Sequence, residues 1–172
     1  MKIAVIYYTK NGVTRECAEK LRDLMVPRHE VTLFDVRTES PSPDGFDVIV
    51  LGSCVRMGRF GKELRTCLER NKAAISQKPS AFFICSGFPN NFEEYASTLL
   101  PKDIRFSLGI HNFGGELKAD KLRGFDKFIV KMVRNSIKTR DFEENDTNPT
   151  SLPEILPGNI SLLAEKIKTL KL

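Results

Sequence analysis

The chain reads Tyr7-Tyr8-Thr9-Lys10-Asn11-Gly12-Val13-Thr14 between an apolar run, Lys2-Ile3-Ala4-Val5-Ile6, and a segment with helical periodicity. This order predicts a β-strand, a turn and the first turn of a helix. Hydroxyl side chains, a glycine and the unbonded backbone N–H groups at a helix start can all hold an anion, and the helix dipole favours negative charge there. We therefore expect residues 9–14 to form a phosphate-binding loop.

Strands and helices alternate along the rest of the chain. Apolar runs predict further strands at 30–36, 46–52 and 81–85, and a fifth strand within 104–117. Helices are predicted from residue 13 to Pro27, after Gly61, over 92–100 and at the C-terminal end of the chain. The apolar positions expected on their buried sides are Val13, Cys17, Leu21, Leu24, Met25, Leu64, Cys67, Leu68, Ala74, Ile75, Ile160, Leu163, Ala164, Ile167 and Leu170.

This alternation predicts an α/β protein with a doubly wound parallel sheet of five strands and helices on both faces. At 172 residues we expect one domain, residues 1–172. Ligands of such sheets bind outside the carboxyl ends of the strands. The segments after the first, third and fourth predicted strands, 9–14, 53–58 and 86–90, are rich in small and polar residues, and all three should emerge at that edge. A single site is implied.

The chain carries a formal net charge of +5 and has a pI of about 9.1, which favours acidic partners. Much of the surplus lies in residues 118–140, where an apolar helical stripe alternates with Lys and Arg. The simpler interpretation is a helix that packs on the sheet with a solvated basic face. The alternative assigns that face to an anionic membrane surface or an acidic substrate, through Lys121, Arg123, Lys127, Lys131, Arg134 and Lys138.

Cys17, Cys54, Cys67 and Cys85 show no CxxC spacing, and only two histidines accompany them, so we expect no metal site and reduced thiols that lie mostly in the core. No signal peptide and no apolar segment of membrane-spanning length is evident. These features predict a cytoplasmic protein, with peripheral attachment to the cell membrane left open. We expect no nucleic acid partner, and homodimer formation stays undecided.

Other phosphate-binding motifs do not match. The sequence GxxxxGK[ST] of Walker-type sites is absent, and the opening loop lacks the GxGxxG dinucleotide fingerprint. Gly52-Ser53 stands where a phosphorelay receiver would carry an aspartate at the end of its third strand. What remains is a mononucleotide, with its phosphate in the first loop and its ring between the other two.

At this point the chain resembles the flavodoxin-like family, whose strand order is commonly 2-1-3-4-5 and whose cofactor is flavin mononucleotide (FMN). The resemblance rests on Thr9-Lys10-Asn11-Gly12-Val13-Thr14 and on the loops that follow the third and fourth strands. It implies that the flavin carries the chemistry, with no catalytic acid or base from the protein. The implied cofactor-binding residues are Thr9, Lys10, Asn11, Gly12, Val13, Thr14, Ser53, Cys54, Val55, Arg56, Met57, Gly58, Ser86, Gly87, Phe88, Pro89 and Asn90. Thr14 could instead only cap the first helix, and Phe88 could be a buried plug.

Within this superfamily the chain is most similar to the menaquinone-dependent protoporphyrinogen dehydrogenase family. The residues that carry the similarity are 8–16, 52–58, 79–83, 114–117 and 125–131. The similarity implies oxidation of a porphyrinogen through FMN, with a quinone as electron acceptor. One departure is the segment 86–100, which is short and carries the acidic pair Glu93-Glu94, where the family has a longer basic insertion.

Three alternatives stay open. The chain could be a flavodoxin-type electron-transfer protein that serves a redox partner protein, an NAD(P)H or quinone reductase with another small-molecule substrate, or a flavodoxin-fold binding module without a cofactor. Electron shuttles of this fold are typically acidic, so the basic pI counts against the first.

Overall fold

The computed structural model describes residues 1–87, 91–115 and 154–171. The strands are β1 (Lys2–Tyr8), β2 (Glu30–Asp35), β3 (Val48–Cys54), β4 (Ser80–Cys85) and β5 (Gly109–Gly114). The helices are α1 (Val13–Met25), α2 (Lys62–Gln77), α3 (Phe92–Thr98) and α5 (Pro157–Lys168). Each predicted strand thus corresponds to a strand of the structure.

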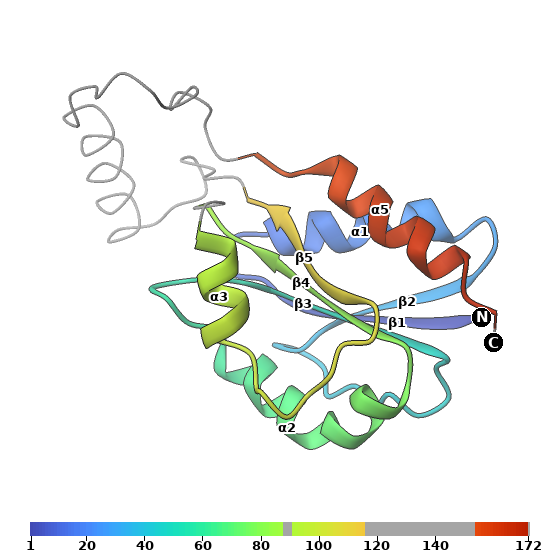
Figure 1. The fold of residues 1–172 in the computed structure, drawn as a ribbon, viewed down its shortest axis with the longest axis horizontal. Helices are drawn as coiled ribbons and strands as arrows, with labels where there is room; N and C mark the ends of the chain where they lie inside the picture. Colours follow the sequence, from blue (N-terminus) through green and yellow to red (C-terminus); the bar gives the residue numbers. More distant parts are fainter. Residues whose placement is uncertain (88–90, 116–153, 172) are drawn as a thin grey trace.

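The five strands form one parallel sheet in the order β2-β1-β3-β4-β5. Helices α1 and α5 cover one face of the sheet and α2 and α3 cover the other (Figure 1). The two faces carry separate apolar clusters, because alternate residues of a strand point to opposite sides. Ile3, Val5 and Phe83 face α1 and α5, whereas Ala4, Ile6 and Phe82 face α2. The predicted doubly wound sheet and its strand order are confirmed.

The central strands are buried along nearly their whole length, which explains their apolar sequences. All of β4 and all of β3 except its last residue are buried, whereas β2 lies at an edge and is only partly buried. Burial on both faces requires continuous apolar runs, and this is the pattern from which these strands were predicted.

The third strand lies two residues further along the chain than predicted. Phe46 and Asp47 precede it: the Phe46 ring packs edge-on against Phe34, and the Asp47 carboxylate accepts a hydrogen bond from the Lys2 N–H at 2.7 Å. The strand instead continues through Ser53 and Cys54, which belong to the predicted following loop. The boundary prediction was therefore wrong at both ends.

Two smaller expectations also need correction. Leu24, expected on the buried side of α1, is 39% exposed. Ala18 is fully buried and belongs to the apolar cluster on that side of the helix. The polar, proline-containing sequence 142–158 predicts a connector that ends at residue 158, whereas helix α5 already begins at Pro157. The basic segment 118–140 lies outside the described residues, so its role in packing or binding stays a prediction.

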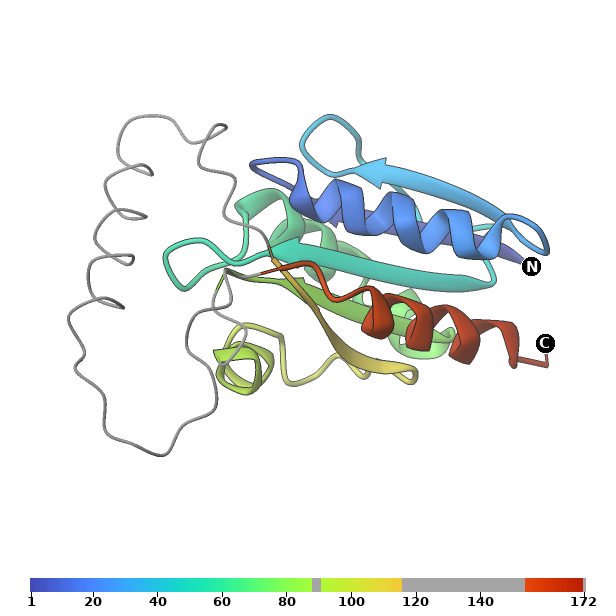
Figure 2. The ribbon, with the colours of Figure 1, turned by 90° about the horizontal axis from the view of Figure 1, so that it is seen from above.

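The chain returns to the sheet beside β5 before α5 begins. The Gly115 N–H donates to the Glu154 carbonyl at 3.0 Å, and the Leu156 N–H donates to the Phe113 carbonyl at 2.9 Å. Helix α5 then runs beside α1 on the same face of the sheet (Figure 2) and buries Ile160, Leu163, Ala164 and Ile167. None of the helices in the described parts of the chain is long and apolar enough to cross a membrane.

The contact between β5 and α5 predicts a pH dependence of stability. His111 Nε2 lies 3.0 Å from the Leu108 carbonyl, which also accepts a hydrogen bond from Lys166 Nζ at 3.0 Å. Burial, and then the Lys166 charge, lower the His111 pKa, although the Leu108 carbonyl opposes the shift. The unfolded chain therefore binds more protons, and the free energy of unfolding should fall as the pH drops from about 6.5 toward the lower pKa of the folded protein.

We expect His111→Gln to reduce this slope, which one proton limits to about 1.4 kcal/mol per pH unit. Urea titrations of both proteins at a series of pH values measure it. Burial also lowers the His29 pKa, so His29→Gln serves as a parallel variant. Part of the dependence of the unfolding free energy on pH should therefore persist in each single variant. An unchanged slope in His111→Gln would contradict the assignment.

Candidate functional site

The carboxyl ends of β1, β3 and β4 finish side by side, so the three loops predicted to form the site emerge together. Tyr8 pairs with Ser53, and Cys54 pairs with Cys85, in the parallel register of the sheet. The turn after β1 and the turn after β3 both project from this end of the sheet (Figure 2).

The first loop leads from β1 into α1 and is organised by its own side chains. The Gly12 N–H donates to Thr9 Oγ1 at 3.0 Å, and Thr9 is buried. Gly12 has φ 89°, a left-handed conformation that favours glycine. The Glu16 N–H donates to the Gly12 carbonyl at 2.9 Å and starts the helical ladder. The N–H groups of the preceding first-turn residues have no acceptor within the helix, which leaves them available to an anion.

Thr14 is the most informative residue of this loop. Its side chain is 0% exposed, and its hydroxyl oxygen has no hydrogen-bond partner among the described residues. It does not cap α1, because Gly12 is the N-cap residue and no side chain caps the helix. A buried hydroxyl without a partner carries a free-energy cost of about 1–3 kcal/mol. The capping alternative is therefore wrong, and the hydroxyl is available to a ligand.

The second loop begins later than expected because β3 includes Ser53 and Cys54. Ser53 is buried, and its hydroxyl donates to the Cys54 carbonyl at 3.0 Å. The Val55 N–H donates to the Cys85 carbonyl at 2.9 Å and ties this loop to the end of β4. The Tyr8 ring lies against Gly61, where a Cβ atom would overlap with it. The loop is thus held at both of its ends.

The tip of this second loop is a tight turn. Arg56 and Arg59 exchange backbone hydrogen bonds of 3.0 and 3.1 Å, and Met57 and Gly58 between them have φ 49° and 68°. Positive φ at both central residues is typical of a type I′ turn. Met57 is 74% exposed at this tip. The turn formed by Arg56, Met57 and Gly58 is therefore exposed at the rim of the site.

The third loop starts where β4 ends and is packed tightly against β5. Ser86 is buried, and its N–H donates to the Gly114 carbonyl at 2.9 Å. A Cβ atom on Gly115 would overlap with the Ser86 backbone. Gly87 is partly exposed. Phe88, Pro89 and Asn90 lie outside the described residues, so their predicted place beside the flavin ring stays a prediction.

Three thiols lie beside the first loop; Cys54 was predicted to belong to the site, whereas its grouping with Cys17 and Cys85 was not predicted from the sequence. Cys17 of α1 lies beside Cys85, and Cys54 is the partner of Cys85 in the sheet register. Burial is the main cause that raises the pKa of both the Cys54 and the Cys85 thiols. The Thr14 hydroxyl lies near enough to lower both pKa values, but its geometry falls short of a hydrogen bond. The one signal in the sequence was that Cys54 and Cys85 each end an apolar run.

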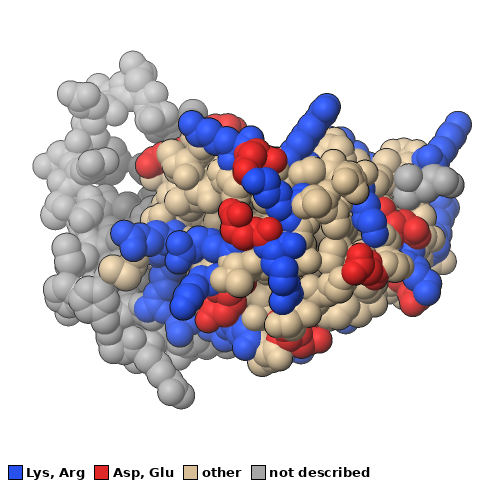
Figure 3. All heavy atoms as spheres, turned by 90° about the horizontal axis from the view of Figure 1, so that it is seen from below, with Lys and Arg blue, Asp and Glu red and all other residues tan. Residues whose placement is uncertain are grey.

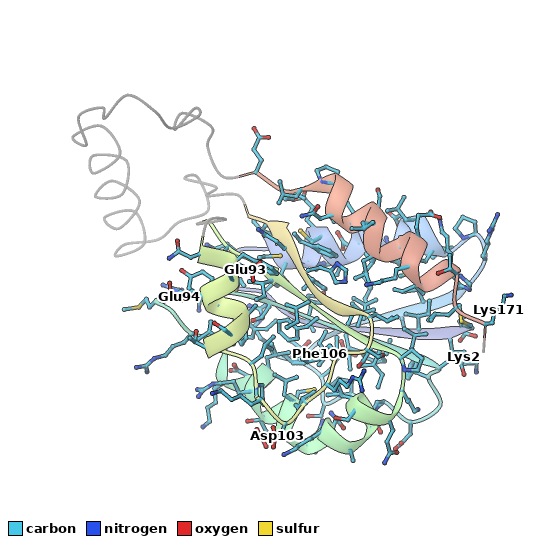
Figure 4. All side chains as sticks on the ribbon, in the orientation of Figure 1. Lys2, Glu93, Glu94, Asp103, Phe106 and Lys171 are labelled. Atoms are coloured by element: carbon cyan, nitrogen blue, oxygen red, sulfur yellow. The ribbon has the colours of Figure 1, made fainter. Side chains whose placement is uncertain are left out.

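Basic side chains lie near the site on the face that α2 and α3 cover. Lys and Arg gather there, including a group over the end of the sheet where β3 and β4 finish (Figure 3). Arg56, Arg59, Lys62 and Arg65 are all exposed. The acidic pair Glu93 and Glu94 lies in the first turn of α3, at the same end of the sheet (Figure 4). The rim therefore carries both signs of charge, with the basic one in excess around the second loop.

Of the predicted site residues, the structure brings together those of the first and second loops with Ser86 and Gly87. Lys10 is exposed, Asn11 is partly exposed and Val13 is buried in the core beneath the loop. The basic residues Lys121, Arg123, Lys127, Lys131, Arg134 and Lys138 lie outside the described residues. In the parts of the chain that the structure describes, no group of three His, Cys, Asp or Glu side chains is placed to hold a metal ion.

Solved structures share this fold at low sequence identity. The flavodoxin of Fusobacterium nucleatum bound to flavin mononucleotide is 12% identical, with a TM-score of 0.54 over 97% of this chain and 96% of that chain. Flavodoxin 1 of Bacillus cereus is 14% identical, with a TM-score of 0.51 over 99% of this chain and 100% of that chain. Rubredoxin oxygen:oxidoreductase of Desulfovibrio gigas is 12% identical, with a TM-score of 0.52 over 96% of this chain. This chain spans only 37% of the Desulfovibrio protein.

A curated relative and a family model extend the comparison to sequence. Protoporphyrinogen IX dehydrogenase (quinone) of Escherichia coli K12 is 22% identical over 144 residues, which cover 77% of this chain and 78% of the relative. The model of the flavodoxin domain family matches residues 4–145, which include the loops that follow β1, β3 and β4. This chain belongs to the flavodoxin domain family.

Proposed function

We propose that this protein binds FMN and acts as an FMN-dependent oxidoreductase of the protoporphyrinogen dehydrogenase type, with a quinone as electron acceptor. The observation that carries the cofactor assignment is the buried Thr14 hydroxyl, which has no partner among the described residues and lies in the first turn of α1. The 22% identity with the Escherichia coli dehydrogenase supports the substrate assignment.

The residues present suit the phosphate of FMN. A phosphate in the first loop would supply the acceptor that Thr14 lacks, and it would accept hydrogen bonds from the N–H groups at the start of α1. Thr9 holds the Gly12 N–H through its own hydroxyl and so fixes the shape of the loop. The exposed Lys10 adds positive charge beside it. Together these groups would stabilise the phosphate dianion.

The protein's own part in the reaction would be to bind and orient. FMN, when bound, accepts electrons from one substrate and passes them to another. Val55 and Gly87, from the loops after β3 and β4, would flank the flavin ring, together with Ser86 and the turn that carries Met57. Arg56 and Arg59, which are both exposed, would attract an anionic substrate such as a carboxylate-bearing porphyrinogen. Lys121, Arg123 and the other basic residues of 118–140 remain candidates for contact with such a substrate or with an anionic membrane.

A second candidate is a flavodoxin-type electron-transfer protein. The observation that favours it is the short connection between β4 and β5, which consists of α3 and its flanking loops and carries Glu93 and Glu94 rather than a basic insertion. The excess of positive charge and the pI of about 9.1 argue against it. The two candidates share the cofactor and differ in the reaction.

Flavin binding is the first test. We expect the purified protein to bind one FMN, with quenched flavin fluorescence, and to bind riboflavin about 100-fold less tightly because riboflavin lacks the phosphate. Equilibrium titration with each flavin measures the two Kd values. Failure to bind FMN would overturn both candidates, and equal affinity for riboflavin would overturn the phosphate loop.

The acceptor separates the two candidates once FMN is bound. The FMN-loaded protein is reduced without oxygen and then mixed either with a soluble menaquinone analogue or with a one-electron acceptor protein. We expect the menaquinone analogue to reoxidise the protein faster. Fluorescence of the porphyrin formed from protoporphyrinogen tests the donor in the same assay. Preference for the one-electron acceptor would favour the electron-transfer protein.

A further inference from the structure

Cys54 differs from the other cysteines in its accessibility. All four cysteines lie within the described residues, and Cys17, Cys67 and Cys85 are only 0%, 4% and 2% exposed. Cys54 is partly exposed, at the last position of β3. A reagent in solution should therefore reach Cys54 more readily than the other three cysteines, which are shielded.

The Cys54 sulfur lies beside the proposed phosphate loop. The Lys10 N–H and the Thr14 hydroxyl both approach it, from opposite ends of the loop. These two groups are among those that we assign to the phosphate of FMN. The Thr14 hydroxyl is fully buried and without a partner, which is a second, independent sign of a ligand at this place. A group attached to the sulfur would therefore enter the space that the phosphate needs.

We propose that Cys54 is a modification site for small disulfides, and that a mixed disulfide at its sulfur and bound FMN exclude each other. In the reaction the Cys54 sulfur attacks one sulfur of the small disulfide, whose S–S bond breaks as the new S–S bond forms. The displaced half leaves as a thiol and takes the proton that Cys54 loses. The small disulfide is the oxidant, and an excess of small thiol reverses the step.

This inference rests on the proposed FMN site and assigns it a form of regulation. Under oxidising conditions the cofactor-free protein would be trapped without flavin, whereas the loaded protein would be protected. Burial raises the Cys54 pKa, so the thiol is protonated at neutral pH and the reaction is slow. Its rate should rise with pH, because the thiolate is the nucleophile.

The test uses hydroxyethyl disulfide and the full-length protein with and without FMN. Mass spectrometry of the intact protein and of its peptides gives the rate and position of the adduct. We expect one adduct, at Cys54, which forms faster at pH about 9 than at pH about 7 and at least about tenfold more slowly when FMN saturates the protein. The purified adduct should bind FMN at least about tenfold more weakly than the untreated protein, and reduction with dithiothreitol should restore the affinity.

Two variants serve as controls, each compared with its own untreated sample. In Cys54→Ser, treatment should leave the FMN affinity unchanged. In Cys67→Ser, treatment should weaken FMN binding as it does in the parent protein, because Cys67 lies on α2, where its sulfur accepts a hydrogen bond from Asn71 Nδ2 at 3.3 Å. If treated Cys54→Ser loses affinity, another cysteine is responsible and the inference is wrong.

Failure of the inference can be told apart from failure of the proposed function. Untreated protein that does not bind FMN would overturn the proposed function. Untreated protein that binds FMN, but whose Cys54 reacts at the same rate with and without the flavin, would overturn the inference alone. An adduct that binds FMN as tightly as the untreated protein would do the same.

Discussion

Thr14→Val should weaken FMN binding about 10- to 100-fold and, without FMN, should leave the protein as stable as the parent or more stable. The two effects have opposite signs because one hydroxyl causes both. A hydrogen bond to a charged group contributes about 1.5–3 kcal/mol, which gives the change in Kd. Without FMN the buried hydroxyl has no partner among the described residues, so its replacement by a methyl group of similar shape removes an unfavourable burial.

Thr14→Ser is the matched control, because it keeps the hydroxyl and removes only a buried methyl group. This variant should bind FMN nearly as tightly as the parent, and its free energy of unfolding should fall by about 1 kcal/mol. Fluorescence titration gives the Kd values, and urea titration of the cofactor-free proteins gives the stabilities. If Thr14→Val binds FMN as the parent does, the hydroxyl does not contact the phosphate.

The sheet could be predicted because burial on both faces leaves a clear pattern in the sequence. Residues 48–51 and 80–85 are apolar or small throughout, as parallel strands covered by helices on both sides require. The ends of β3 could not be predicted, because Phe46 precedes the strand and is apolar for its ring contact with Phe34 of β2. Ser53 and Cys54 are small polar residues that the sheet accepts because Ser53 donates to the next carbonyl.

The loop of the site could be predicted, and the groups beneath it could not. Thr9, Gly12 and Thr14 lie close together in sequence, so their spacing alone identifies a candidate anion site. Cys17, Cys54 and Cys85 come from a helix and two strands and meet only through the register of the sheet, in which Cys54 pairs with Cys85. Local sequence patterns do not reveal that register, so the position of Cys54 among these cysteines could be seen only in the structure.

Gly52→Ala should lower the free energy of unfolding by about 3 kcal/mol, the upper range for overpacking a core. Gly52 lies in the central strand β3, between Tyr7 of β1 and Phe83 of β4. A Cβ atom at Gly52 would overlap with the Phe83 ring. That ring is fully buried and stacked on Phe113, with centroids 4.4 Å apart, so it has no room to move aside. Urea titration of the cofactor-free protein measures the loss.

The cause can be isolated with two further variants. Gly158→Ala, in the first turn of α5, has no atom within 4 Å of the added Cβ and should change the stability by less than about 1 kcal/mol. Phe83→Leu removes the ring and leaves room for the new methyl group, so the double variant Gly52→Ala with Phe83→Leu should lose at least about 1 kcal/mol less than the sum of the single losses. Additive losses would mean that the ring is not what excludes a side chain at Gly52.

Because β3 ends two residues later at the thiol and the second loop, the same overlap would also displace Cys54, and Gly52→Ala should weaken FMN binding along with stability.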